Sequence, residues 1–352
     1  MRWRNLSVQS TDLGLAFVVL VWGFSPTLFK IVLEELDPLA FVFLRFMTLC
    51  VLAVAVLTWR GLRGGRAWRI ARADLPLLIV SGLSGYGVYQ LCYMVGLAHT
   101  TVFASALLAA TIPLWTAVIA FGLRIERIAP LQWLGIVVSL GGVAWFLVSG
   151  TSHRSELPAD HALTATDLLL GNALTLGAAV LFALYGVANK RLAPRYSPPE
   201  LMCYTLLIGT IALAPFGIPA LLHQDWSRVT WHSWAILPYS VIFPIYVTYS
   251  LWNWAIGLRG VGYVTLFSYA VPVMGGLFAF LLLGEALTLW QVAAAAVVLG
   301  GMLVARRGIV QRAAPQRRGH AAQPSHAPGD GVLAAHAPPD GVLRETGTTP
   351  LA

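Results

Sequence analysis

Charged residues are scarce in this chain of 352 residues: Asp, Glu, Lys and Arg make up 11% of it, while 58% of the residues are hydrophobic. A soluble protein carries about 25% charged residues, so most of this chain belongs in lipid. The net charge of +8 comes from basic residues in short loops between apolar runs. Basic loops of this kind are typical of membrane topology signals, and they exclude nucleic acid as the expected partner.

Cysteine is also rare. Cys50, Cys92 and Cys203 all lie inside apolar runs, without a CxxC pair or a neighbouring histidine cluster. This pattern argues against a disulfide framework and against a zinc site. We expect no metal and no cofactor.

Acidic residues are missing from the interiors of the apolar runs, and Asp12 and Glu200 stand only at their edges. Buried carboxylates are the usual proton relays and the usual partners of cationic drugs. Their absence argues against proton antiport through a buried acid and against multidrug cation efflux. It also removes the carboxylate pair or activated nucleophile that a membrane enzyme needs, so we expect no enzyme.

The sequence has ten apolar runs that can cross a bilayer, each about 20 residues long at a rise of about 1.5 Å per residue. They are residues 13–33, 39–59, 75–97, 100–122, 131–149, 168–189, 201–222, 234–258, 262–283 and 288–305. The expected fold class is therefore all-α integral membrane, with ten transmembrane helices.

The chain is an internal duplication. Lys30 and Pro38 reappear as Lys190 and Pro198, 160 positions later, and the matches Pro113–Pro272, Glu126–Glu285, Gln132–Gln291, Gly141–Gly300 and Gly142–Gly301 follow at offset 159. Five spans per copy is an odd number, so the second copy enters the membrane from the opposite side. Two inverted five-helix repeats with a site at their interface are typical of alternating-access transporters.

The loop charges predict the orientation, because positively charged loops stay in the cytoplasm. Both termini are expected there, in a multi-pass protein of a bacterial plasma membrane. The expected organisation is a first repeat at 1–150, an extracytoplasmic linker at 151–167, a second repeat at 168–307 and a disordered cytoplasmic tail at 308–352. The tail is rich in Ala, Pro, Gly and His, and it cannot bury a core.

The third and eighth spans are rich in amphipathic side chains. Tyr86, Gln90 and Tyr93 recur on one helical face, and the equivalent stretch of the second copy holds Tyr249, Trp252 and Asn253. Trp22 and Tyr185 lie in the first helix of each copy. These residues line a central substrate cavity or, alternatively, make interfacial belts and interhelical contacts.

Two cations fall within apolar runs. Lys30 and Arg45 form a basic vestibule for a carboxylate or phosphate, or they are interfacial anchors, with Lys30 paired to Glu34 and Arg45 to Asp37 or Glu35. Arg45 is the better substrate-binding candidate, because Thr205 replaces it in the second copy.

Three pairs of duplicated residues suggest structural devices. Pro113 and Pro272 are expected to kink their spans and to act as gates or hinges. Glu126 and Glu285 each precede the next helix, whose positive N-terminus they are expected to stabilise. The Gly141-Gly142 and Gly300-Gly301 pairs predict close helix packing.

These motifs resemble the drug/metabolite transporter superfamily, specifically its EamA-type ten-helix transporters. The likeness spans about residues 12–307 and rests on Trp22-Gly23, Lys30, Pro38 and Arg45-Phe46, on the stretch from Leu107 through Pro113 to Glu126 and Gln132-Trp133, and on Gly284-Glu285 with Trp290-Gln291. One departure is Arg124-Ile125-Glu126, where the first copy lacks the glycine of the second. The resemblance implies export of small metabolites, often amino acids.

The expected function is secondary transport, specifically efflux of small amphipathic metabolites such as amino acids, with the substrate and the lipid bilayer as the partners. Two alternatives stay open: a flippase for lipid-linked or isoprenoid-linked molecules, and a membrane-embedded lipid-modifying enzyme. No motif in the sequence specifies an oligomeric state.

Overall fold

The computed structural model describes residues 2–62, 70–152, 164–259 and 261–320. Within these ranges every regular element is helical. Ten stretches are long and apolar enough to cross a membrane, which confirms the expected fold class. They are Ser10–Val32, Pro38–Trp59, Arg72–Ala98, Val102–Gly122, Pro130–Val148, Ala165–Leu192, Pro198–His223, Trp231–Ile256, Leu266–Leu283 and Leu289–Arg307.

Six of these spans are continuous α-helices. They are α1 (Arg2–Val32), α2 (Pro38–Leu62), α7 (Pro130–Ser152), α8 (Ala165–Leu192), α9 (Pro198–His223) and α14 (Leu289–His320). Capping boxes stabilise the N-termini of the first two helices of the second repeat. Thr164 and Asp167 form the one at α8, and Ser197 and Glu200 form the one at α9. These contacts satisfy amide groups that a helix N-terminus otherwise leaves unpaired.

The third and eighth spans each contain a π-helical turn. The third span comprises η1 (Arg72–Asp74), α3 (Leu75–Gly82), the π-turn η2 (Leu83–Gly87) and α4 (Val88–Ala98). The eighth, after the short η4 (Trp226–Arg228), comprises α10 (Trp231–Val241), the π-turn η5 (Ile242–Val247) and α11 (Thr248–Arg259). The two π-turns occupy equivalent positions of the repeats. Such turns are frequent at functional sites.

The fourth and ninth spans are interrupted. The fourth divides into α5 (Val102–Ala109) and α6 (Ile112–Gly122), and the ninth into α12 (Val261–Ser268) and α13 (Val271–Leu283). Pro113 and Pro272 stand at the starts of α6 and α13, where the missing N–H of proline costs nothing. The expected kinks therefore take the form of a short interruption of the helix just before each proline, and the expected role of the prolines as gates or hinges stays a prediction.

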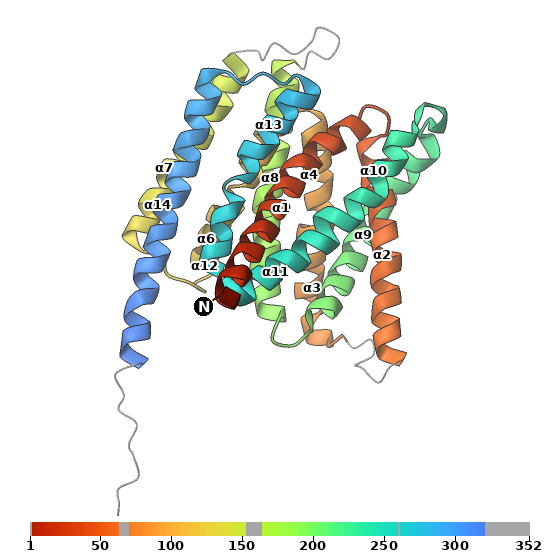
Figure 1. The fold of residues 1–352 in the computed structure, drawn as a ribbon. Coiled ribbons are helices and arrows are strands. Elements are labelled where there is room, and N and C mark those ends of the chain that lie inside the picture. Colours follow the sequence, from red (N-terminus) through yellow and green to blue (C-terminus); the bar gives the residue numbers. More distant parts are fainter. Residues whose placement is uncertain (1, 63–69, 153–163, 260, 321–352) are drawn as a thin grey trace, which may run out of the picture. The chain divides into compact units, whose positions relative to one another are not determined.

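The two repeats are inverted, and helices of each repeat pack against helices of the other. In Figure 1, α1 and α8, the first helices of the two repeats, run in opposite directions. The helix α1 packs against α13 of the second repeat, and α8 packs reciprocally against α6 of the first. The helices α2 and α9, which are also equivalent, pack on each other, with Phe41 and Phe46 in the same buried core as Leu206 and Leu213.

Glycines allow close approach of α7 and α14, as the duplicated pairs predict. A Cβ on Gly142 would lie 2.9 Å from Val298, and one on Gly301 would lie 2.5 Å from the backbone of Ser139. The Ser139 hydroxyl donates to the Val298 carbonyl at 2.9 Å. Gly141 and Gly300 face open space instead, so only one glycine of each pair has the packing role.

Equivalent loops tie the repeats together at both ends of the bundle. Glu35, after α1, accepts hydrogen bonds from Ser233 at 2.6 Å and from the amide of Thr230 at 2.9 Å. At the opposite end Arg195, after α8, forms an ion pair with buried Asp74. The hydrogen bond from Ser233 lowers the pKa of Glu35.

The C-terminal helix extends beyond the expected start of the tail at residue 308, because its backbone is helical to His320. The prediction of disorder for residues 321–352 lies outside the described residues, as does most of the expected linker at 151–167.

Candidate functional site

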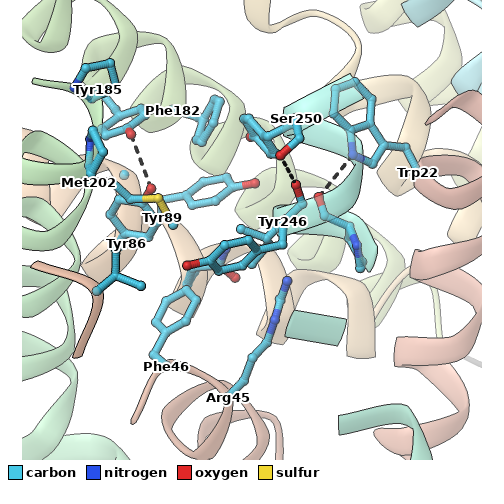
Figure 2. A pocket seen from close by; sticks show the side chains of 18 residues that line it. Trp22, Arg45, Phe46, Tyr86, Tyr89, Phe182, Tyr185, Met202, Tyr246 and Ser250 are labelled. Carbon is cyan, nitrogen blue, oxygen red and sulfur yellow. Dashed lines mark hydrogen bonds between the residues drawn. The ribbon is translucent and has the colours of Figure 1, made fainter. Parts of the chain in front are cut away.

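A cavity of about 530 Å³ lies between the two repeats. Its walls come from α1, α2, η2 and α4 of the first repeat and from α8, α9, η5 and α11 of the second (Figure 2). The lining residues are Trp22, Arg45, Phe46, Val56, Gly85, Tyr86, Tyr89, Gln90, Phe182, Tyr185, Pro198, Pro199, Met202, Pro244, Ile245, Tyr246, Tyr249 and Ser250. Eight of these residues are aromatic, and one, Arg45, is cationic.

Six of the expected substrate-binding residues line this cavity: Trp22, Arg45, Tyr86, Gln90, Tyr185 and Tyr249. Two others lie behind it. The Tyr93 ring stacks on Tyr89 at 5.9 Å between centroids, and the Trp252 ring lies 5.0 Å from Trp22. The side chain of Asn253 is outside the described part of the structure.

Several cavity residues were not among those expected to bind substrate, and four of them follow a pattern that is visible in the sequence. Tyr89 is one position before Gln90 and one helical turn after Tyr86, so it belongs to the face already identified. Phe182 follows Trp22 by 160 residues, the offset that relates the first helices of the repeats. Tyr246 and Ser250 follow Tyr86 and Gln90 by the same 160 residues, whereas Met202 follows no comparable pattern.

Hydrogen bonds fix several aromatic walls. The Trp22 indole donates to the Thr248 hydroxyl at 2.9 Å and to the Pro244 carbonyl at 3.2 Å, and its ring lies edge-on to Tyr249. Across the cavity, the hydroxyls of Tyr86 and Tyr185 are 3.3 Å apart (Figure 2). Each contact joins one repeat to the other, so the cavity shape depends on how the repeats are docked.

A glycine allows the second contact. The ring of Tyr185 packs directly on Gly85 in the π-turn η2, where a Cβ would lie 2.3 Å from it. Gly23 beside Trp22 is similarly tight, with Met274 at 2.7 Å from a Cβ, whereas Gly186 beside Tyr185 faces open space. Close packing therefore explains Gly23 but not Gly186.

Arg45 points into the cavity (Figure 2) and is only 5% exposed. Its Nη2 donates to the Ser240 carbonyl at 3.0 Å, and its guanidinium lies 5.0 Å from the Phe29 ring centroid. No ion pair joins it to a carboxylate among the described residues. The two carboxylates considered as ion-pair partners of Arg45 bind other groups. Asp37 accepts a hydrogen bond from the amide of Leu39, and Glu35 accepts one from the Ser233 hydroxyl.

Lys30 also has a different partner from the one expected. Its ammonium lies 3.8 Å from Glu285 of the second repeat and donates to the Thr100 carbonyl. Glu285 accepts from the amide of Val102 at 2.9 Å. The helix N-terminus that it stabilises is therefore that of α5, not of the helix that follows it in the chain. Burial raises the pKa of Glu285, although Lys30 opposes the shift.

Glu126, the counterpart of Glu285, forms an ion pair with Lys190, the counterpart of Lys30. For Glu285 the expected partner, the next helix, is therefore wrong, whereas the role of Glu126 at the next helix stays a prediction. Both carboxylates make contacts between the repeats that sequence spacing does not reveal.

Comparison with known proteins supports the duplication. The model of the EamA-like transporter family matches the chain twice, over residues 9–148 and 169–307. A "Probable terminal-alkyne amino-acid exporter" of Streptantibioticus cattleyicolor is 29% identical over 300 residues, 85% of this chain and 94% of that protein. A "Probable amino-acid metabolite efflux pump" of Escherichia coli is 26% identical over 308 residues, 82% of this chain and 91% of that protein.

The fold has a relative among solved structures. One crystal structure matches with a TM-score of 0.56 and 21% identity, and the match covers 87% of this chain and 99% of the other. At this identity the match concerns the fold alone.

Proposed function

Because this chain belongs to the EamA-like transporter family, we propose that it exports small amphipathic metabolites such as amino acids across a bacterial plasma membrane. The observation that carries the proposal is the aromatic cavity of about 530 Å³ between the repeats. This volume lies within the range of about 300–1,000 Å³ for small-molecule sites. The family and the relatives are transporters rather than enzymes.

The lining suits a molecule that is apolar at one end and polar at the other. Trp22, Tyr86 and Tyr249 offer ring faces and edges to an apolar group. Arg45 and Gln90 offer polar groups on the same cavity. The printed names of the relatives, which concern amino-acid export and efflux, support the same substrate class.

We propose alternating access as the mechanism. An inverted pair of repeats with a site at its interface has two arrangements of similar energy, related by exchanging the roles of the repeats. The exchanged contacts of α1 with α13 and of α8 with α6 support this scheme. Pro113 and Pro272 stand at the breaks of the fourth and ninth spans, where we propose that the half-helices hinge.

Efflux from cells tests the function. Cells that overproduce the protein and cells that lack it are loaded with amino acids, and the external concentrations are followed over time. Overproduction should speed the release of at least one amino acid, and Tyr249→Ala should reduce that release at normal membrane levels. Phe280→Ala is the matched control, since Phe280 is 57% exposed and does not line the cavity. Equal release from both cell types would contradict the proposal.

Orientation is tested separately. A reporter fused to the C-terminus should be active in the cytoplasm, and one inserted after Asp160 should be active outside. The opposite pattern would reverse the topology without affecting the cavity.

A further inference from the structure

Arg45 is a buried cation, and no carboxylate in the described part of the chain forms an ion pair with it. Moving a charge out of water costs several kcal/mol unless a counter-charge compensates. Here the compensation is partial: the Ser240 carbonyl accepts one hydrogen bond, and the rings of Phe29 and Phe46 lie 5.0 and 5.9 Å away. The Nε atom is buried and has no hydrogen-bond partner.

A ligand carboxylate would accept the hydrogen bond that Nε of Arg45 can donate. Guanidinium groups bind carboxylates through parallel N–H donors. The two rings limit the movement of the Arg45 side chain, which leaves a donor group preorganised beside the cavity.

Gln90 provides a second unsatisfied group in the same cavity. Its side-chain Oε1 is buried without a hydrogen-bond partner. A carbonyl oxygen of this kind accepts hydrogen bonds from an ammonium group. The cavity therefore presents a donor for a carboxylate, an acceptor for an amine, and aromatic surface for an apolar group.

We infer that the cavity recognises a zwitterionic α-amino acid with a large apolar side chain. Arg45 binds its carboxylate, Gln90 accepts a hydrogen bond from its ammonium group, and Trp22 and Tyr249 contact its side chain. This inference rests on the proposed function and narrows it to one charge pattern.

Binding to the purified protein tests the inference with three probes: phenylalanine, phenylalaninamide, which lacks the carboxylate, and 3-phenylpropanoate, which lacks the amine. The wild-type protein should bind phenylalanine best. Arg45→Gln should weaken the binding of phenylalanine by about 10-fold or more, which is the loss expected for one charged hydrogen bond. The affinity for phenylalaninamide should not change. Gln90→Leu should abolish the preference for phenylalanine over 3-phenylpropanoate.

Equal losses for the acid and the amide in Arg45→Gln would overturn the inference, as would a wild-type protein that binds none of the three probes. Arg45→Lys retains the charge and should restore part of the preference. Efflux of other metabolites by wild-type cells, combined with a negative binding result, would leave the proposed function standing and remove only this substrate class.

Two lysine–glutamate pairs, each joining one repeat to the other, support a second, independent inference. Lys30 of the first repeat meets Glu285 of the second, and Lys190 of the second meets Glu126 of the first. The two pairs are equivalent by the repeat offset and lie at opposite ends of the bundle, because the repeats are inverted. Their environments differ sharply: the side chains are 19% and 3% exposed in the first pair, and 63% and 51% in the second.

The cavity reaches toward the end with the exposed pair. Pro198, Pro199 and Met202, at the start of α9, line it, and α9 begins just after α8, which carries Lys190. No loop residue from the end of Lys30 is part of the lining. The buried pair thus stands at the closed end of the cavity.

We propose that the two pairs are reciprocal latches. The pair at the closed end is buried and holds α1 against α13 and the start of α5, and in the opposite state Lys190 and Glu126 are buried while Lys30 and Glu285 are exposed. This second inference also rests on the proposed transport cycle.

Labelling with a membrane-impermeant maleimide tests the latches without any substrate. In a background with Cys50, Cys92 and Cys203 replaced by alanine, Thr27→Cys places one thiol near Lys30 at a position that is fully buried. Reagent is added to intact cells and to inverted vesicles. Lys30→Gln should increase labelling several-fold from the side of Lys30, and Lys190→Gln, the matched control, should not.

Unchanged labelling in Lys30→Gln, with normal membrane levels and thermal unfolding, would show a purely structural pair and overturn the latch. Equal increases in both variants would also overturn it. Should Lys30→Gln fail to accumulate, Lys30→Met gives the same readout with an apolar side chain of similar length.

Discussion

The two repeats build one cavity from equivalent positions, of which some carry the same side chain, as Tyr86 and Tyr246 do, and others differ in chemistry. Trp22 and Phe182 are related by the offset of 160 residues, and both line the cavity. Arg45 and Thr205 are related in the same way, but Arg45 faces the cavity while Thr205 is fully buried and donates to the Leu201 carbonyl at 2.7 Å. The duplication therefore accounts for the equivalent positions around the cavity, and differences at single positions, such as Arg45 and Thr205, make the site asymmetric.

Exchanging Arg45 and Thr205 should have the largest effect. Arg45→Thr should fold, because it removes a buried charge, yet lower the efflux of carboxylate-bearing substrates by about 10-fold or more. Thr205→Arg buries an unpaired charge at a cost of several kcal/mol, so its membrane level and its melting temperature in detergent should fall. The double exchange should not restore efflux. Restored efflux would mean that the two sites are interchangeable and that the asymmetry has no role.

The two glutamates should differ in their contribution to stability. Glu285→Gln leaves Lys30 without its buried partner, and loss of such a partner costs about 3–5 kcal/mol. Glu126→Gln breaks an exposed pair worth about 0.2–1 kcal/mol. Thermal unfolding in detergent measures both. Similar shifts in the two variants would show that the difference in burial has no energetic consequence.

Gly85→Ala probes the contact between the repeats at the cavity. The added Cβ would meet the Tyr185 ring, and overpacking of this kind costs about 1–3 kcal/mol. Displacement of Tyr185 should lower efflux severalfold at normal membrane levels. Gly186→Ala, on the helix of Tyr185 itself, meets open space and serves as the control, with efflux close to wild type.

Trp22→Phe and Phe182→Leu should have the smallest effects. The first removes the indole hydrogen bonds to Thr248 and Pro244, worth about 0.5–1.5 kcal/mol. The second removes ring contacts of Phe182 with Tyr89 and Tyr185, of similar worth. Efflux assays over a substrate series should show a modest rise in the half-saturating concentration for each variant. A complete loss of efflux in only one of the two variants would mean that the residues of one repeat alone bind the substrate.

The fold was predictable because its causes are local in the sequence. Apolar runs of span length, a repeat offset and basic loops specify the ten spans, and the expected boundaries differ by only a few residues from those observed. The odd number of spans per repeat predicts inversion without any tertiary information. Six of the nine residues expected to bind substrate line the cavity, since helical spacing places polar and aromatic groups on one face.

The contacts between repeats could not be predicted from the sequence. The pairing of Lys30 with Glu285 depends on the docking of α1 against α13, and no spacing rule relates residues so far apart. The π-turns were missed for a similar reason: Leu83–Gly87 reads as ordinary helix by hydrophobic periodicity. Asn253 and the tail beyond residue 320 stay predictions.

The π-turns allow the two cavity-lining helices to reorient side chains at a small cost in free energy. A π-turn accommodates one residue more than an α-turn, and successive residues of an α-helix are rotated by about 100°. Shifting η2 or η5 by one position along its helix would swing Tyr86 or Tyr246 around the axis, while the helix ends stay anchored in their loops. Trp22, which donates to Pro244 inside η5, would register such a shift as a change in indole fluorescence.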